Sequence, residues 1–178
     1  MSTSPSPTST PNTRHRWDIH LKPGEDDRMR PQLVEPIARG LIAAGVNLKH
    51  ARSGKPRPVH SLYHLDLDGE SWAFRLFPYC HLRWLWRITL GIPSRDGFGL
   101  HDPKEFSLLD EEITEQTGRD LAALIRALQS GGTPAWPMFD QDQSFPRYAW
   151  SNAASERYED WRKWDRDQKA GAPTRRVA

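Results

Sequence analysis

The spacing of apolar side chains near the start of the chain changes from a strand pattern to a helix pattern. Over residues 17–21, Trp, Ile and Leu alternate with Asp and His, which predicts a half-buried strand. Over residues 33–42, apolar side chains recur at three- and four-residue spacing, which predicts a helix. Pro31 or Pro36 suits the first turn of this helix, and Gly45 suits its C-terminal cap.

A second alternating region predicts a hairpin and a third strand. Residues 62–67 and 72–77 both alternate, and Asp68-Gly69 between them is a strong signal for a two-residue hairpin turn. Pro78 ends the ladder, and residues 81–90 supply the next strand. The segment 95–99 is interpreted as a flexible loop that leads into a second helix.

The second helix has the most regular apolar stripe in the chain. Acidic residues 110–112 favour its N-terminal end, Arg126 lies near its other end, and Gly131 follows it. The predicted order is therefore β-α-β-β-β-α, an α+β domain with a mostly antiparallel sheet and two helices packed on one face. The stripe consists of Ile113, Thr117, Leu121, Leu124, Ile125 and Leu128.

Composition divides the chain around this domain. Residues 1–13 hold only Met, Ser, Thr, Pro and Asn, which predicts a disordered tail. Residues 14–132 form the single α+β domain, which ends after Gly-Gly. We expect 133–170 to be an extended arm with a short aromatic helix, and 171–178 to be a second disordered tail. The arm either packs back on the domain or contacts a partner.

Composition also excludes several classes of protein. The start of the chain has no basic and apolar signal pattern, and no run is long and apolar enough for a membrane helix. Cys80 is the only cysteine, so neither an internal disulfide nor a zinc cage of cysteines is expected. The expected location is the cytoplasm. Eight tryptophans in 178 residues supply large apolar side chains for a core.

The charges are segregated, although the net charge is only +2. Between residues 36 and 65 there are five Lys or Arg residues and no carboxylate. Between residues 102 and 120 there are seven acidic residues against two basic ones. One face of the protein is therefore suited to anions, although a charge run can also simply face water.

The third predicted strand adds arginines to this basic surface. Its apolar face carries Trp84 and Trp86 into the core, so Arg83 and Arg87 project from the other face, about 13 Å apart at strand rise. Phosphate groups of a nucleic acid fit such a surface, although the tryptophans point away from it and are not available for base stacking. The predicted nucleic-acid-binding residues are Lys49, Arg52, Lys55, Arg57, Arg75, Arg83 and Arg87.

No pattern in the chain specifies catalysis, a cofactor or a metal. His60 and His64 lie too far apart on a strand to share an ion directly, and a site would also need His81. Residues 66–70 are explained by a hairpin turn and lack a calcium-loop pattern. Cys80 has no identified base and is interpreted as a small buried hydrophobe.

These observations predict a small non-enzymatic binding protein that contacts nucleic acid through the basic segment 49–57 and the outer arginines. The alternative is a protein-interaction or regulatory module that acts through the acidic helix and the aromatic arm. An enzyme without a recognisable motif is the third hypothesis. Oligomeric state is not predicted. In the alternative, the partner-binding side chains are Tyr158, Trp161 and Trp164.

Overall fold

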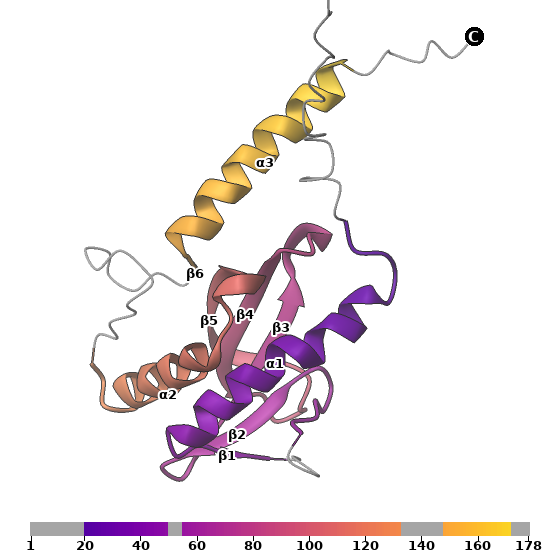
Figure 1. The fold of residues 1–178 in the computed structure, drawn as a ribbon. Helices are drawn as coiled ribbons and strands as arrows, with labels where there is room; N and C mark the ends of the chain where they lie inside the picture. The colour runs from indigo at the N-terminus through magenta and orange to yellow at the C-terminus, as the bar shows by residue number, and fades with distance from the viewer. Residues whose placement is uncertain (1–19, 50–54, 133–147, 172–178) are drawn as a thin grey trace, which may run out of the picture.

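The computed structural model describes residues 20–49, 55–132 and 148–171. Over these residues the chain forms three α-helices and a six-stranded, mostly antiparallel sheet, so the predicted α+β class is confirmed (Figure 1). No helix within these three ranges is long and apolar enough to cross a membrane. The predicted tail 1–13 and most of the predicted tail 171–178 lie outside the described residues.

The elements follow one another with short connections, except between β1 and β2 and before β6. Two 3-10 turns, Tyr79–His81 and Asp110–Glu112, follow β3 and β5. The helices and strands are α1 (Glu25–Ala43), β1 (Asn47–Leu48), β2 (Tyr63–Leu67), β3 (Glu70–Pro78), β4 (Leu85–Pro93), β5 (Leu100–Leu109), α2 (Glu115–Gln129), β6 (Tyr148–Trp150) and α3 (Asn152–Gly171).

The order of strands in the sheet is the same as their order in the chain. Each strand is antiparallel to the one before it, except that β6 runs parallel to β5. The β2–β3 turn confirms the predicted hairpin, because Asp68 and Gly69 both have positive φ, 51° and 85°. Two positive φ angles are typical of the turn that matches the twist of a two-residue hairpin.

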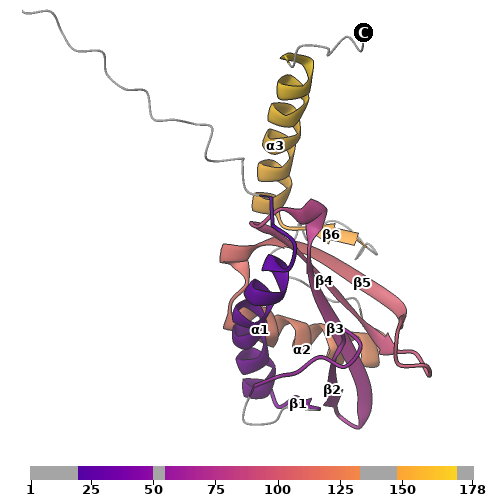
Figure 2. The same cartoon turned by 90° about the vertical axis from the view of Figure 1, so that its right-hand side faces the viewer.

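Helices α1 and α2 cover one face of the sheet (Figures 1 and 2). Their apolar stripes, including Leu41 and Leu121, pack on the inward side chains of β2 to β5. The predicted alternation is confirmed on β4, where Trp86, Ile88 and Leu90 are all buried in this core. Arg87 and Thr89 therefore lie on the opposite, outer face of the sheet.

The predicted start of the first helix is wrong. Helix α1 begins at Glu25, so Pro31 and Pro36 lie inside it rather than in its first turn. The first turn is acidic, which suits the positive end of a helix, and Arg30 pairs with two of these acids at helical spacing. Of the predicted strand 17–21, only His20 and Leu21 are described, and His20 forms an isolated bridge with Leu82.

The segment between β4 and α2 also differs from the prediction. A ten-residue strand, β5, occupies residues that were expected to lead directly into the helix. Helix α2 begins only at Glu115, and the three acids at 110–112 form a separate 3-10 turn. The predicted strand 81–90 is shifted as well, because β4 begins at Leu85 after a turn in which Cys80 and His81 have positive φ.

A second apolar cluster holds α3 against the end of the sheet. Ala154 and Trp161 of α3 are buried with Leu82, Trp84, Leu85 and Leu109. The aromatic helix is longer than expected, with 20 residues, and its last turns extend beyond the sheet (Figure 2). The arm residues 133–147 lie outside the described residues.

Candidate nucleic-acid interface

The arginines predicted to line the outer sheet face are held by partners in the same chain. Arg87 lies 3.4 Å from Glu105 and stacks 4.3 Å from the centre of the Tyr79 ring. Arg83 lies before β4 rather than in it and forms an ion pair with Glu25 at the start of α1, so its predicted place on the outer sheet face is wrong. Their charges are therefore largely offset by neighbouring acids, which lowers their value for binding an anion.

The basic segment 49–57 contains, among its described residues, one cation that is paired with an acid and two that are not. The Lys49 ammonium lies 2.9 Å from Asp66 and donates to the Ser71 hydroxyl at 3.0 Å. Arg52 lies outside the described residues. Lys55 and Arg57 are exposed, and neither has an ion-pair partner in the described part of the chain. These two side chains remain the available cations of the predicted segment.

The connection that carries Lys55 and Arg57 also carries His60, which contacts the β4–β5 loop. The His60 ring, on the loop before β2, lies 4.2 Å from the Phe98 ring on the β4–β5 loop, with the planes tilted by 41°. His60 and Ser61 both have positive φ, in a tight turn closed by the Val59–Leu62 bridge. Phe98 is 61% exposed, which is unusual for a large apolar side chain.

The β4–β5 loop is fixed by hydrogen bonds within it. The Asp96 carboxylate accepts from the Ser94 hydroxyl and from the Phe98 amide at 3.0 Å, and the Gly99 amide donates to the Ser94 hydroxyl at 3.0 Å. The Ser94 hydrogen bond, with the backbone amide next in importance, holds the pKa of Asp96 below its usual value. Arg75 of β3 donates to the Phe98 carbonyl at 2.9 Å, so the sheet anchors the loop that carries the exposed ring.

We call this surface the loop patch. It combines an exposed aromatic pair with four cations, and Asp96 is the carboxylate within the loop that carries Phe98. Arg95 is exposed three residues before Phe98, and no ion pair within the described ranges engages it. The loop patch consists of Lys55, Arg57, His60, Arg75, Arg95 and Phe98.

Sequence reasoning missed the aromatic half of this surface. The sequence predicts a flexible loop at Phe98 and indicates no contact between this residue and His60. A signal was nevertheless present, because an isolated Phe between two glycines has no apolar neighbours with which to form a stripe. Such a residue on a loop is a stronger indication of binding than the same residue in a strand.

The three histidines considered as metal ligands, His60, His64 and His81, lie on different elements. His60 lies against Phe98, His64 is in β2, and His81 is the last residue of the 3-10 turn after β3. Within the described ranges, no three His, Cys, Asp or Glu side chains are placed to hold one metal ion. Cys80 is exposed rather than buried, with its sulfur 4.0 Å from the Tyr158 hydroxyl, so its interpretation as a buried hydrophobe is wrong.

The aromatic edge of α3 packs on the domain. Trp161 is only 9% exposed, its ring makes an edge contact with His20 at 6.2 Å, and Tyr158 and Trp164 pack against the same cluster. The acidic side chains are also engaged, since Glu111 pairs with Arg157 at 2.7 Å and Glu115 with Arg119 at 2.6 Å. A role for Tyr158, Trp161 and Trp164 in partner binding stays a prediction.

Comparison with protein family models, with curated proteins and with solved structures finds no match. The functional argument therefore depends on the chemistry of the surface itself. Among the predicted cations, that chemistry favours the ones in the loop patch over Arg83 and Arg87, which are both paired with acids.

Proposed function

We propose that the protein binds single-stranded nucleic acid through the loop patch. The observation that carries this proposal is the exposed Phe98 ring, supported by His60 and flanked by cations on both loops. A nucleobase stacks on an aromatic ring with about 1–3 kcal/mol per base. Lys and Arg side chains contact the phosphates and displace their counterions.

A single strand suits this surface better than a duplex. In a duplex the faces of the bases are stacked on one another, so a protruding aromatic ring finds no free base. The loop patch also offers one aromatic pair rather than a helix or ribbon shaped for a groove. We therefore expect binding to depend on unpaired bases, with little dependence on their identity.

The Phe98→Ala variant of the full chain tests this function. Fluorescence anisotropy with labelled DNA and RNA single strands of about 12 nucleotides measures the affinity at low salt. Loss of one stacked base predicts a binding constant about 5- to 150-fold weaker. The amide and carbonyl of Phe98 remain in place in this variant, so the hydrogen bonds of the loop are kept.

The Ile42→Ala variant is the matched control, because Ile42 is 54% exposed and belongs to α1 rather than to either loop of the loop patch. Its affinity should equal that of the unmodified protein. Two results would overturn the proposal: no salt-sensitive binding of any single strand by the unmodified protein, or equal losses in the Phe98 and Ile42 variants.

A further inference from the structure

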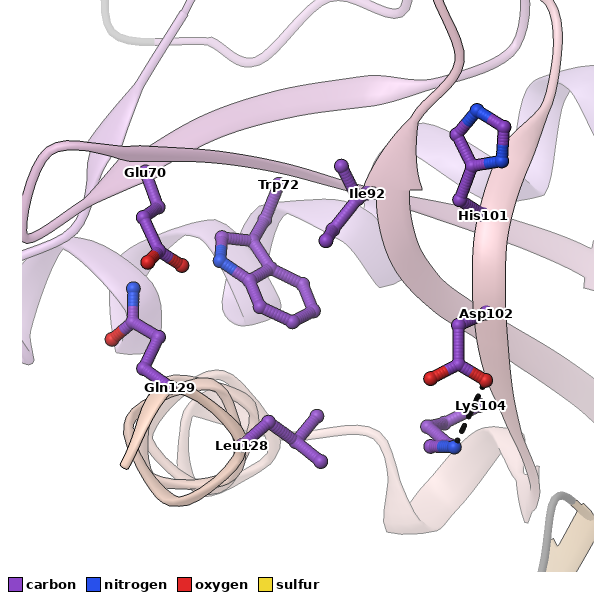
Figure 3. Close-up of a pocket in the computed structure, with 8 residues that line it drawn as sticks. All are labelled: Glu70, Trp72, Ile92, His101, Asp102, Lys104, Leu128 and Gln129. Carbon is purple, nitrogen blue, oxygen red and sulfur yellow. Dashed lines mark hydrogen bonds and ion pairs between the residues drawn. The ribbon is translucent and has the colours of Figure 1, made fainter. Parts of the chain in front are cut away.

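A cavity of about 290 Å³ lies between the sheet and the end of α2, apart from the loop patch (Figure 3). Strand β3 contributes Glu70 and Trp72, β4 contributes Ile92, and β5 contributes His101, Asp102 and Lys104. The last turn of α2 closes the cavity with Leu128 and Gln129. No residue of the loop patch lines it.

The apolar wall of the cavity contains a hydrogen-bond donor that has no acceptor. Trp72 is 7% exposed, and its indole nitrogen is buried without a hydrogen-bond partner among the residues that the structure describes. A buried N–H group is costly unless something accepts its proton. Because Trp72 lines the cavity, a ligand there can supply that acceptor (Figure 3).

An acceptor without a donor lies beside this group. Glu70 is two residues before Trp72 on β3, so both side chains are on the same face of the strand. Its carboxylate is exposed and makes no ion pair or hydrogen bond within the described ranges. Figure 3 shows this carboxylate on the side of the cavity to which the indole nitrogen points. Gln129 is on that side too, but its amide nitrogen is used on the Leu67 carbonyl at 3.0 Å.

A β-bulge shapes the opposite wall. The register between β4 and β5 shifts between Leu90 and Ile92, and a Cβ on Gly91 would lie 2.8 Å from the His101 carbonyl oxygen. Asp102 follows with φ 44°, and its carboxylate is paired with Lys104 at 3.3 Å. The bulge leaves Ile92 exposed at the cavity, and bulges are frequent beside binding sites.

We infer that this cavity binds one planar heterocycle that carries a hydrogen-bond acceptor and a donor on the same edge, as a nucleobase does. The ligand accepts from the Trp72 indole and donates to the Glu70 carboxylate, while its apolar faces lie against Ile92 and Leu128. The volume is near the lower end of the range for ligand pockets, about 300–1,000 Å³, which suits one or two rings. The inference does not depend on the loop patch.

The Trp72 indole proton gives a direct measurement. In the full chain labelled with ¹⁵N-tryptophan, the eight tryptophans give one indole signal each, and Trp72→Phe identifies the signal of Trp72 by its loss. Titration with adenosine up to about 10 mM, ten times a Kd of about 1 mM, should move this signal downfield and saturate. An unchanged Trp72 signal overturns the inference.

Two further comparisons test whether the Glu70 carboxylate accepts a hydrogen bond from the ligand. N6,N6-dimethyladenosine lacks the amino hydrogens, and Glu70→Gln replaces the charged acceptor by a weaker neutral one, so each should weaken binding about tenfold or more. Glu111→Gln changes an acid that pairs with Arg157 outside the cavity and should leave the titration unchanged. Equal affinity in Glu70→Gln and the unmodified protein would overturn the assigned role of Glu70.

A titration with single-stranded oligo-dA shows whether the heterocycle comes from a nucleic acid or from a free nucleoside. If oligo-dA moves the Trp72 signal as adenosine does, the cavity takes a base from a strand. If adenosine alone moves it, the cavity takes a free nucleoside. Repeating the adenosine titration in Phe98→Ala separates this site from the loop patch, because the cavity keeps its affinity even where the proposed strand binding fails.

Discussion

Gly40 of α1 and Gly118 of α2 lie against each other where the two helices cross. A Cβ on Gly40 would lie 1.9 Å from the Glu115 carbonyl oxygen, and one on Gly118 would lie 2.1 Å from the Ile37 carbonyl oxygen. The helices therefore touch backbone to backbone at this point. The crossing holds α2 close to α1. It therefore fixes the position of α2, whose last turn lines the cavity.

Gly118→Ala should destabilise the protein by about 1–3 kcal/mol or more, because the backbone that the new methyl group meets cannot move aside without separating the helices. Helix propensity alone would give the opposite sign, a gain of about 1 kcal/mol. Urea unfolding measures the difference. Gly132→Ala is the control, since a Cβ there meets nothing closer than 3.5 Å. Equal stability of the two variants would contradict the close crossing.

Ser151 joins α3 to the rest of the domain. Its hydroxyl accepts from the Ala154 amide at 3.1 Å, as a helix cap does, and donates to Glu112 at 2.6 Å. Ser151→Ala should therefore cost about 1–2 kcal/mol and leave the partly buried Glu112 carboxylate with one donor fewer. Faster hydrogen exchange confined to α3 and the 110–112 turn would support this role. Ser155→Ala, at an exposed position, should change nothing, and a matching effect there would refute it.

The salt dependence of binding separates available cations from paired ones. Arg57→Ala should reduce the slope of log affinity against log salt by about 0.7, the contribution of one phosphate contact on a single strand. Arg87→Ala should leave this slope unchanged, because Glu105 and Tyr79 already hold its guanidinium. A larger change in the Arg87 variant would assign the interface to the outer sheet face instead.

The ion pair of Lys49 and Asp66 predicts a dependence of stability on pH. Hydrogen bonding by Lys49, with Ser71 adding to it, holds the pKa of Asp66 below its usual value. A lowered pKa in the folded state stabilises the protein above the usual pKa of an aspartate, and this contribution is lost as the pH falls through the lowered value. Asp66→Asn should therefore cost up to about 1 kcal/mol at neutral pH.

The difference between Asp66→Asn and the unmodified protein should shrink as the pH falls below the usual pKa of an aspartate and vanish once the pH is below the lowered pKa of Asp66. Thermal unfolding across this range measures it. Asp167→Asn, on the exposed end of α3, should show no such trend. A cost for Asp66→Asn that persists undiminished at the lowest pH would show that the side chain acts through packing rather than charge.

The elements with local signals were predictable. The β2–β3 hairpin follows from alternation and from the Asp68-Gly69 turn, and α2 follows from a regular stripe. Strand β5 was missed because His101, Asp102 and Lys104 at its start resemble a loop. Its strand conformation depends on hydrogen bonds to β4, a pairing that a local pattern does not contain.

The cations of the candidate site could be predicted from the sequence, but their partners and the aromatic contact could not. Basic residues are visible in a sequence, but the acids that neutralise them are not, as the pairing of Arg83 with Glu25 across the fold shows. The contact of His60 with Phe98 joins two loops that are far apart in the chain. Only the folded arrangement brings an aromatic pair to the cations that the charge map had identified.

The order of the strands in the sheet has a consequence for the time course of folding. From β2 to β5, each strand pairs with its neighbour along the chain, which keeps the loops to be closed short and favours rapid folding. Strand β6 and α3 join only after the longer connection 133–147. We expect the second apolar cluster, which contains Trp161, to form last. Until then, Leu85 and Leu109 lack their cover, and a chain halted at that stage is the form most liable to aggregate.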